Sequence, residues 1–405
     1  MQKIVIAKPY RFVPPRHGNF WSHLMLPAVP FYLSKSHGVT SVTCRGADRL
    51  RASLAAGHGI ILTANHSRLC DPLVIGLLAV QVRCLLYTMA SWHVFMQNRF
   101  YGWLLPRIGV FSIYREGLDR EGLKCAIRLL TAARRPLLLF PEGVLSRHND
   151  RLNHLMEGVA IIARAAARQR AALNPPGRIV IHPIAIRYVF DGDIEATVTP
   201  VLEDLEARMA WRPQRELPLI ERVLKVGSAM LALKEIEYCG EPQCGEIVER
   251  VQQLIERILR PLEEEWLQGR QSGDVVHRVK ALRKAILPDM TGDALPPQEQ
   301  ERREKHLADI YLVQQLFNYP SGYFTPAPTP ERILETVERF EEDTTDIARI
   351  HRPLRAIVDV GEAIPATPEC EYGNDGDPLM GEIREQLYAL LAASLKEVHP
   401  GAEML

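Results

Sequence analysis

The sequence contains no window of ~18 uncharged apolar residues, the length that a membrane-spanning helix requires. The longest apolar stretch, Leu73 to Ala90, is interrupted by Arg83. The first fifteen residues contain three prolines in place of the apolar run of a secretory signal. We therefore expect a chain with neither a membrane span nor a signal peptide.

Paired cysteines are also missing. The seven cysteines are odd in number and scattered, and no C-x-x-C occurs. This pattern is typical of reduced thiols in a cytosolic protein and not of a disulfide framework. Cys239 and Cys244 precede His277 at a spacing that suits zinc poorly, so we predict no metal site.

The chain has no net charge, but its two halves differ. Residues 1–190 hold 25 Lys and Arg against 8 Asp and Glu, a net charge of +17; residues 191–405 hold 24 against 41, a net charge of −17. A basic amino-terminal half suits an anionic membrane surface or phosphate-bearing substrates. Mutual attraction between the two halves is the alternative interpretation, and we predict no nucleic-acid partner.

The segment from Phe20 to Leu33 is apolar and aromatic but too short to span a bilayer. It fits a helix lying in the membrane interface or a helix of the protein core. We therefore separate residues 1–39 as an amino-terminal segment with a possible interfacial role.

Apolar runs of strand length alternate with helix-like stretches between residues 58 and 190. This alternation predicts an α/β fold in which a mixed sheet is covered by helices. The expected strands are Ile60–Ala64, Cys84–Met89, Val110–Tyr114, Leu137–Phe140 and Ile179–Val189, with a last strand at Ile194–Leu202. We assign residues 40–205 to this domain.

Residues 206–405 are predicted as a mostly helical extension of unknown role, rich in Glu and Arg. Within it we expect a short strand at Arg355–Ala363, a stiff connector at Pro326–Pro330 and an open loop at Pro365–Pro378. No internal repeat is visible, and the oligomeric state is not predicted.

The sequence Asn65-His66-Ser67-Arg68-Leu69-Cys70-Asp71 follows the first strand of this domain. A histidine that hydrogen-bonds a carboxylate can remove a proton from a hydroxyl group. Asp71 followed by Pro72 is also a good helix start, which needs no chemistry. If His66 lies in the loop and Asp71 begins the helix, the two side chains can meet.

Three later strands end in chemically useful residues. Gly109 to Arg115 ends in an arginine suited to binding phosphate, and Phe140-Pro141-Glu142-Gly143 places a carboxylate at the edge where α/β folds bind ligands. Pro183 interrupts a buried strand and marks an edge or a packing site for another group. His182 is expected to be a core histidine with its hydrogen bonds satisfied.

Together, N-H-x4-D, G-x-F-x-I-x-R, F-P-E-G and the proline-bearing strand resemble the PlsC-type glycerolipid acyltransferase family over residues 40–205. The resemblance implies transfer of an acyl group from acyl-CoA or acyl-carrier protein to a lysophospholipid such as 1-acyl-glycerol-3-phosphate, with no permanently bound cofactor. It also implies a cytoplasmic protein, peripheral on the inner face of the membrane.

The resemblance assigns roles to individual residues. His66 would be the general base and Asp71 its partner, and Arg115 would hold the acceptor phosphate. Glu142 and Gly143 would shape the acceptor pocket, and Pro183 would lie near the acyl groove.

The sequence departs from the family pattern around the acceptor. Arg68 stands where a small hydroxyl residue is usual, and Val144-Leu145-Ser146 replaces the usual T-R-S. Arg68 and Arg147 are the cations that can substitute. Alternative interpretations are a non-phosphate lipid acceptor, a hydrolase that activates water, and a catalytically silent membrane-binding scaffold. Cys70 is not expected to be a nucleophile.

Overall fold

The structure is a computed structural model that describes residues 9–291, 295–324, 327–347, 349–369 and 377–405. It divides into two compact units, which we call the sheet unit, Arg11–Gly192 with Ile350–Leu405, and the helical unit, which contains Asp193–Arg349. Cys370 and parts of the connector predicted over 326–330 and of the loop predicted over 365–378 lie outside the described residues.

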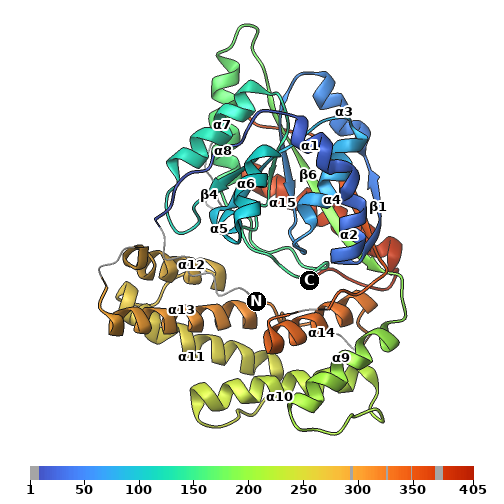
Figure 1. Cartoon of the computed structure of the whole chain (residues 1–405), viewed down its shortest axis with the longest axis vertical. Coiled ribbons are helices and arrows are strands. Elements are labelled where there is room, and N and C mark those ends of the chain that lie inside the picture. Colours follow the sequence, from blue (N-terminus) through green and yellow to red (C-terminus); the bar gives the residue numbers. More distant parts are fainter. Residues whose placement is uncertain (1–8, 292–294, 325–326, 348, 370–376) are drawn as a thin grey trace. The chain divides into compact units, whose positions relative to one another are not determined.

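The sheet unit is built on a mixed eight-stranded sheet of order β1-β7-β6-β2-β5-β3-β4, with β8 beside β6 (Figure 1). Strand β7 runs antiparallel to β6, and the other neighbours along this order are parallel. The strands are β1 Val39–Arg45, β2 Gly59–Ala64, β3 Tyr87–Ser91, β4 Val110–Ile113, β5 Leu137–Leu139, β6 Ile179–Phe190, β7 Leu354–Val360 and β8 Ile364–Pro365. The predicted α/β class with a mixed sheet is confirmed.

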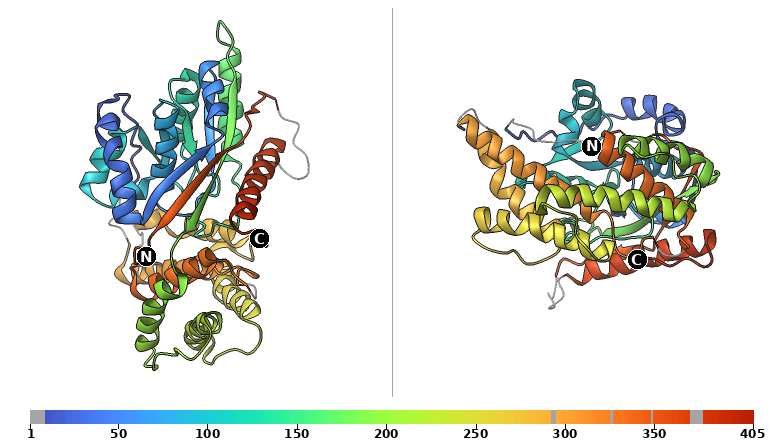
Figure 2. Two further views of the ribbon diagram at one scale, coloured as in Figure 1. Left: turned by 90° about the vertical axis from the view of Figure 1, so that its right-hand side faces the viewer. Right: turned by 90° about the horizontal axis from the view of Figure 1, so that it is seen from below.

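Helices cover both faces of this sheet, as expected when β2, β5 and β6 are buried along their whole length. Apolar side chains of α7, α8 and α15 pack with β2, β5 and β6 in one core, while α3 and α4 contact β7. Figure 2 shows α15 on one side of the sheet and α1 and α2 on the other. The helices are α1 Phe20–Met25, α2 Val29–His37, α3 Ala47–Ala55, α4 Asp71–Gln81, α5 Trp92–Met96, α6 Arg99–Arg107, α7 Arg120–Ala132, α8 Gly158–Ala171 and α15 Pro378–Val398.

The strand predicted at Ile194–Leu202 is wrong, because these residues begin helix α9, Ile194–Arg208. Its β-branched residues favour a strand locally. However, Asp193 caps the helix by accepting the backbone N–H of Ala196 at 3.0 Å. Val198, Val201, Leu202 and Leu205 are buried at helical spacing. Tertiary burial and the cap therefore override the local preference.

The predicted boundary at residue 205 is also displaced, since residues 350–405 return to the sheet unit. The expected short strand near Arg355 exists as β7, but it lies between β1 and β6 inside the main sheet. The sheet unit consequently carries 27 Lys and Arg against 19 Asp and Glu, a net charge of +8. The charge contrast between the structural units is smaller than that between the sequence halves.

The helical unit contains α9, α10 Leu219–Cys239, α11 Ile247–Leu267, α12 Val275–Ile286, α13 Pro297–Phe317 and α14 Pro330–Thr345. Side chains from α10 to α13 form a core of their own, including Leu231, Leu259, Leu282 and Ile310. Across the described part of the chain, no helix has both the length and the apolar character that crossing a membrane requires.

The structure reveals an internal repeat that we did not recognise in the sequence. Three successive helix-to-helix turns contain a buried glutamate, a glutamine eight residues later and an arginine seven or eight residues after that. In each turn the arginine Nε and Nη2 donate to both glutamate oxygens at 2.7–2.9 Å. The three glutamate–arginine pairs are Glu206–Arg222, Glu235–Arg250 and Glu263–Arg278.

The glutamine of each repeat closes the turn. Its side-chain amide donates to the carbonyl two residues earlier, at 2.8 Å for Gln214, 3.0 Å for Gln243 and 2.9 Å for Gln271. All three glutamates are fully buried, so their charge must be compensated by the arginines. The repeated element is therefore the turn that locks each helix to the next.

Replacing Arg250 with lysine should lower the free energy of unfolding of the α10–α11 turn by about 1.5–3 kcal/mol. Lysine keeps the charge but cannot form the two parallel hydrogen bonds to Glu235. Hydrogen exchange of α10 and α11 peptides measures this effect. Arg260→Lys is the control, because Arg260 pairs with Glu264 on the surface; equal exchange in both variants would contradict the prediction.

Candidate active site

The loop between β2 and α4 brings His66 and Asp71 together. His66 Nδ1 and Asp71 Oδ2 are 2.8 Å apart. Asp71 is the first residue of α4 and is fully buried. Its Oδ2 also accepts the backbone N–H of Arg68 at 3.0 Å. Because a carboxylate only accepts, His66 Nδ1 carries the proton and Nε2 is the nitrogen available as a base.

The loop after β5 holds the backbone of His66 on both sides. The His66 N–H donates to Glu142 Oε1 at 2.8 Å, and the His66 carbonyl accepts the N–H of Ser146 at 2.7 Å. The imidazole stacks on Phe140, with ring centroids 4.1 Å apart. The side chain is 20% exposed. His66 is thus fixed in orientation but remains reachable.

Glu142 lies behind His66 and not at the surface of the site. It is 1% exposed, and its second oxygen accepts the N–H of Asn153 at 3.1 Å. Burial raises the pKa of Glu142 to about 7, although the two backbone donors favour the charged form. Any effect of Glu142 on an acceptor pocket therefore passes through the loop that it holds.

Arg115 and Gly143 are in direct contact, since the Arg115 guanidinium donates to the Gly143 carbonyl. Gly143 has a φ of +66°, and a Cβ at this position would lie 2.7 Å from the Met156 sulfur. Only glycine fits this turn without strain. The carboxyl-terminal ends of β4 and β5 therefore lie together at the edge of the sheet that carries His66.

The remaining predicted site residues are Arg68, Arg147 and Pro183, and each lies in a different part of the sheet unit. The Arg68 guanidinium lies 5.4 Å from the centre of the Tyr188 ring, beside Asp71. Arg147 follows Ser146 with a φ of +60°, in the loop that holds His66. Pro183 is buried inside the sheet, pairs with Thr63 of β2 and accepts the N–H of Gly361 at 2.7 Å. Its position beside an acyl groove stays a prediction.

Three contacts of this site were missed in the sequence: the stacking of Phe140, the Ser146 hydrogen bond and a hydrogen bond from the Tyr188 hydroxyl to Asp71 Oδ1 at 2.5 Å. Phe140 directly precedes Pro141-Glu142, so its position near His66 could have been predicted from the sequence. Ser146 and Tyr188 lie 80 and 117 residues from their partners, and no local pattern indicates such pairing.

Burial bears on two further residues of the site. It raises the pKa of the Cys70 thiol to about 11, which disfavours the thiolate that a nucleophile requires. His182 is fully buried, with Ser53 Oγ 2.9 Å from Nε2 and the Gly361 carbonyl 2.9 Å from Nδ1. It is the satisfied core histidine that the sequence predicted.

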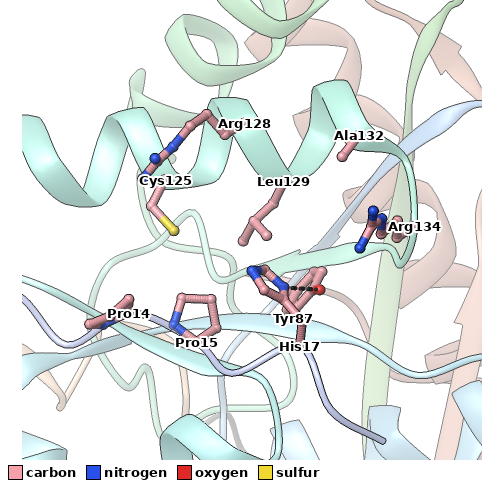
Figure 3. A pocket seen from close by; sticks show the side chains of 9 residues that line it. All are labelled: Pro14, Pro15, His17, Tyr87, Cys125, Arg128, Leu129, Ala132 and Arg134. Carbon is pink, nitrogen blue, oxygen red and sulfur yellow. Dashed lines mark hydrogen bonds between the residues drawn. The ribbon is translucent and has the colours of Figure 1, made fainter.

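A cavity of about 460 Å³ lies elsewhere, between α7 and the segment leading to α1 (Figure 3). Its lining includes Pro14, Pro15, Leu129 and Tyr87, whose hydroxyl is 2.8 Å from His17 Nδ1. Tyr87 is the first residue of β3, whereas His66 follows the last residue of β2. The cavity is therefore at the opposite edge of the sheet from His66.

Replacing Glu142 with glutamine should make the free energy of unfolding less dependent on pH. The Glu142 pKa is about 7 in the folded state and ~4.3 in a free side chain. The folded protein therefore retains this proton between about pH 4.5 and 7, and the free energy of unfolding falls by about 3 kcal/mol as pH rises through that window. The difference between wild type and Glu142→Gln isolates this slope.

Glu121→Gln is the control for this comparison, because Glu121 is exposed. Unfolding is followed by hydrogen exchange of peptides from the His66 loop at several pH values. A Glu142→Gln variant that retains the wild-type slope would show that another group is responsible.

Comparison with known proteins shows a likeness over the part of the chain that holds this site. Residues 41–187 match the family described as Acyltransferase. A stretch of 106 residues is 34% identical to a 1-acyl-sn-glycerol-3-phosphate acyltransferase of Streptococcus pneumoniae, and it covers 26% of this chain and 37% of that relative. His66, Asp71, Arg115 and Glu142 all lie within the family match. Residues 41–187 of the sheet unit are therefore similar to the acyltransferase family, and the match spans about a third of the chain and of this relative.

Proposed function

We propose that this chain is an acyltransferase that moves a fatty acyl group from a thioester donor to the hydroxyl of a lysophospholipid. The observation that carries the proposal is the 2.8 Å hydrogen bond between His66 Nδ1 and Asp71 Oδ2. It leaves Nε2 as a base at the carboxyl-terminal end of β2, where α/β folds bind ligands. The Streptococcus pneumoniae relative is a 1-acyl-sn-glycerol-3-phosphate acyltransferase, which supports the same reaction.

His66 Nε2 removes the proton from the acceptor hydroxyl while its oxygen attacks the thioester carbonyl. Asp71 stabilises the imidazolium that forms. Backbone N–H groups at the start of α4 stabilise the oxyanion, since the helix dipole is positive there. Collapse of the tetrahedral intermediate forms the new ester and breaks the C–S bond, and the imidazolium returns its proton to the thiolate.

The acceptor is a phosphate-bearing lysophospholipid such as 1-acyl-glycerol-3-phosphate. Arg115 is the residue assigned to its phosphate, because it lies beside the Gly143 turn and is exposed. Arg68 and Arg147 flank His66 in the two neighbouring loops and supply further positive charge. Acyl-CoA or acyl-carrier protein is the donor, and the step needs no permanently bound cofactor.

Exposed apolar side chains on α1, α2 and α6 suit contact with an anionic membrane. Phe20, Leu24, Phe31 and Phe100 are 68%, 55%, 71% and 55% exposed, whereas Leu33 at the far end of the segment is buried. Trp21 of α1 packs on Trp103 of α6 with ring centroids 4.7 Å apart. We call Phe20, Leu24, Phe31, Phe100 and Trp103 the aromatic surface. Exposed aromatic residues near arginine are typical of interfacial binding.

The reaction is tested with the purified chain, palmitoyl-CoA and lysophosphatidic acid, with lipid products identified by mass spectrometry and released thiol measured in parallel. Phosphatidic acid equal in amount to the thiol supports the proposal. Free palmitate in place of phosphatidic acid would show a hydrolase. If palmitoyl-CoA and palmitoyl-acyl-carrier protein both release no thiol, with lysophosphatidic acid and with other lysophospholipids, a membrane-binding scaffold becomes the interpretation.

The membrane contact is tested by flotation with vesicles of phosphatidylglycerol. Phe20→Ser with Phe100→Ser should lower the bound fraction by about tenfold or more, because each phenylalanine loses the benefit of burial in lipid. Leu173→Ser is the matched control, since Leu173 is exposed after α8. Equal binding by both variants would contradict this part of the proposal.

A further inference from the structure

Strand β6 extends well beyond its partner β2. The last pair between them joins Ala64 and Ile184, and β6 continues to Phe190 with β7 on one side. Two asparagines replace the missing neighbour on the other side. Asn65 exchanges two hydrogen bonds with the Ile186 backbone at 2.7 and 3.0 Å, and Asn149 exchanges two with the Tyr188 backbone at 2.8 and 2.9 Å.

This extension carries the Tyr188 side chain to the His66 loop. The ring is fully buried, and its hydroxyl donates to Asp71 Oδ1 at 2.5 Å. The Cys70 sulfur lies 3.3 Å from the same hydroxyl. Asp71 thus accepts from Tyr188 on one oxygen and from His66 and the Arg68 backbone on the other.

We propose that Tyr188 is a positioning residue of the reaction, whose hydroxyl holds the Asp71 carboxylate so that Oδ2 faces His66. The inference rests on the proposed function, because it concerns the same general base. Tyr188 touches no substrate atom and acts through Asp71 alone.

Two observations separate this role from a structural one. The Tyr188 backbone is already held by β7 and Asn149, so the strand does not need the hydroxyl. Burial and the adjacent Asp71 charge raise the pKa of Tyr188 well above its usual value. The phenol therefore keeps its proton and remains a donor across the working pH range.

A buried carboxylate needs each of its donors, because few alternatives exist without water. Removing the Tyr188 hydroxyl leaves Asp71 Oδ1 without this donor, so the negative charge of the carboxylate is less compensated. Asp71 can then rotate and misalign His66, and its less compensated charge favours the protonated form of the imidazole. Among the described residues, the charged or titratable groups near this point include Arg68, Cys70, Glu142, His37 and Tyr32, and these are retained when only Tyr188 is changed.

The test compares Tyr188→Phe with Tyr87→Phe. Both changes delete one buried tyrosine hydroxyl, but Tyr87 bonds His17 at the other edge of the sheet. Tyr188→Phe should lower kcat about tenfold with less than a twofold change in either KM. The acid limb of its pH–rate profile should move to higher pH by roughly half a unit. Tyr87→Phe should change neither quantity.

An NMR titration of the His66 ring gives a readout that needs no turnover, and its midpoint should rise in Tyr188→Phe alone. An unchanged midpoint and unchanged kcat would overturn the positioning role while leaving acyl transfer intact. A lower kcat without a change in midpoint, accompanied by a lower melting temperature, would also overturn it. If the His66 midpoint rises in Tyr188→Phe but the wild-type protein shows no acyl transfer, the proposed function is refuted, while the role of Tyr188 in holding Asp71 stands.

Discussion

Replacing His66 with alanine should lower the rate of the proposed acyl transfer by about 10²–10⁴-fold, the usual contribution of a positioned general base. The KM values should change little, because the residues assigned to substrate binding are unchanged. Cys70 is a poor substitute for the lost base, because burial raises the pKa of its thiol to about 11. Initial rates of thiol release and lipid product formation measure the effect.

His277→Ala is the matched control for this prediction. His277 Nδ1 lies 2.8 Å from Asp274 Oδ1, so the helical unit contains a second histidine–aspartate contact of the same length. That pair is exposed at the start of α12 and follows no sheet strand. Full activity in His66→Ala, or an equal loss in His277→Ala, would remove His66 from the mechanism.

Replacing Arg187 with methionine should destabilise the sheet unit by about 3–5 kcal/mol. Arg187 is 2% exposed and pairs with Asp150 at 2.5 Å. It also donates to Ser394 Oγ and the Leu391 carbonyl at 2.9 Å. One side chain therefore joins β6, the loop that holds His66 and α15. Methionine preserves much of the volume but leaves Asp150 buried without this cation.

Hydrogen exchange of β6 and α15 peptides measures this loss without requiring the whole chain to unfold in one step. Arg355→Met is the control. Arg355 pairs with Asp191 at 3.2 Å in the same unit, but both side chains are about 40% exposed, and such pairs contribute about 0–1 kcal/mol. Similar exchange in both variants would mean that the buried pair contributes little to stability.

The central strands and the convergence of the motifs were predictable from the sequence. Strands β2 and β5 are short apolar runs that end at turn residues, and both signals are local. Parallel strands end at one edge of a sheet, which is why Arg115 and the Glu142–Gly143 turn lie close together. The structure brings them into contact through the Gly143 carbonyl. The roles assigned to them remain predictions.

Features that depend on distant partners were not predictable. Helix α9 resembles a strand until its burial is known, and Tyr188 is one tyrosine among twelve until Asp71 is placed beside it. The glutamate–arginine turns were missed because the helical unit contains many residues of both types. Only the geometry distinguishes the pairs that are buried from those on the surface.

The insertion of β7 between β1 and β6 has a consequence for synthesis of the chain. Val39 pairs with Leu354, 315 residues later, so β1 has no strand beside it until β7 has left the ribosome. Closing so long a loop is slow, and the open edges invite wrong partners in the meantime. A fragment ending at residue 205 would also lack β7, so β1 would have no strand to form hydrogen bonds with. The smallest part of this protein that can complete its sheet therefore extends through β7 and β8, to Pro365.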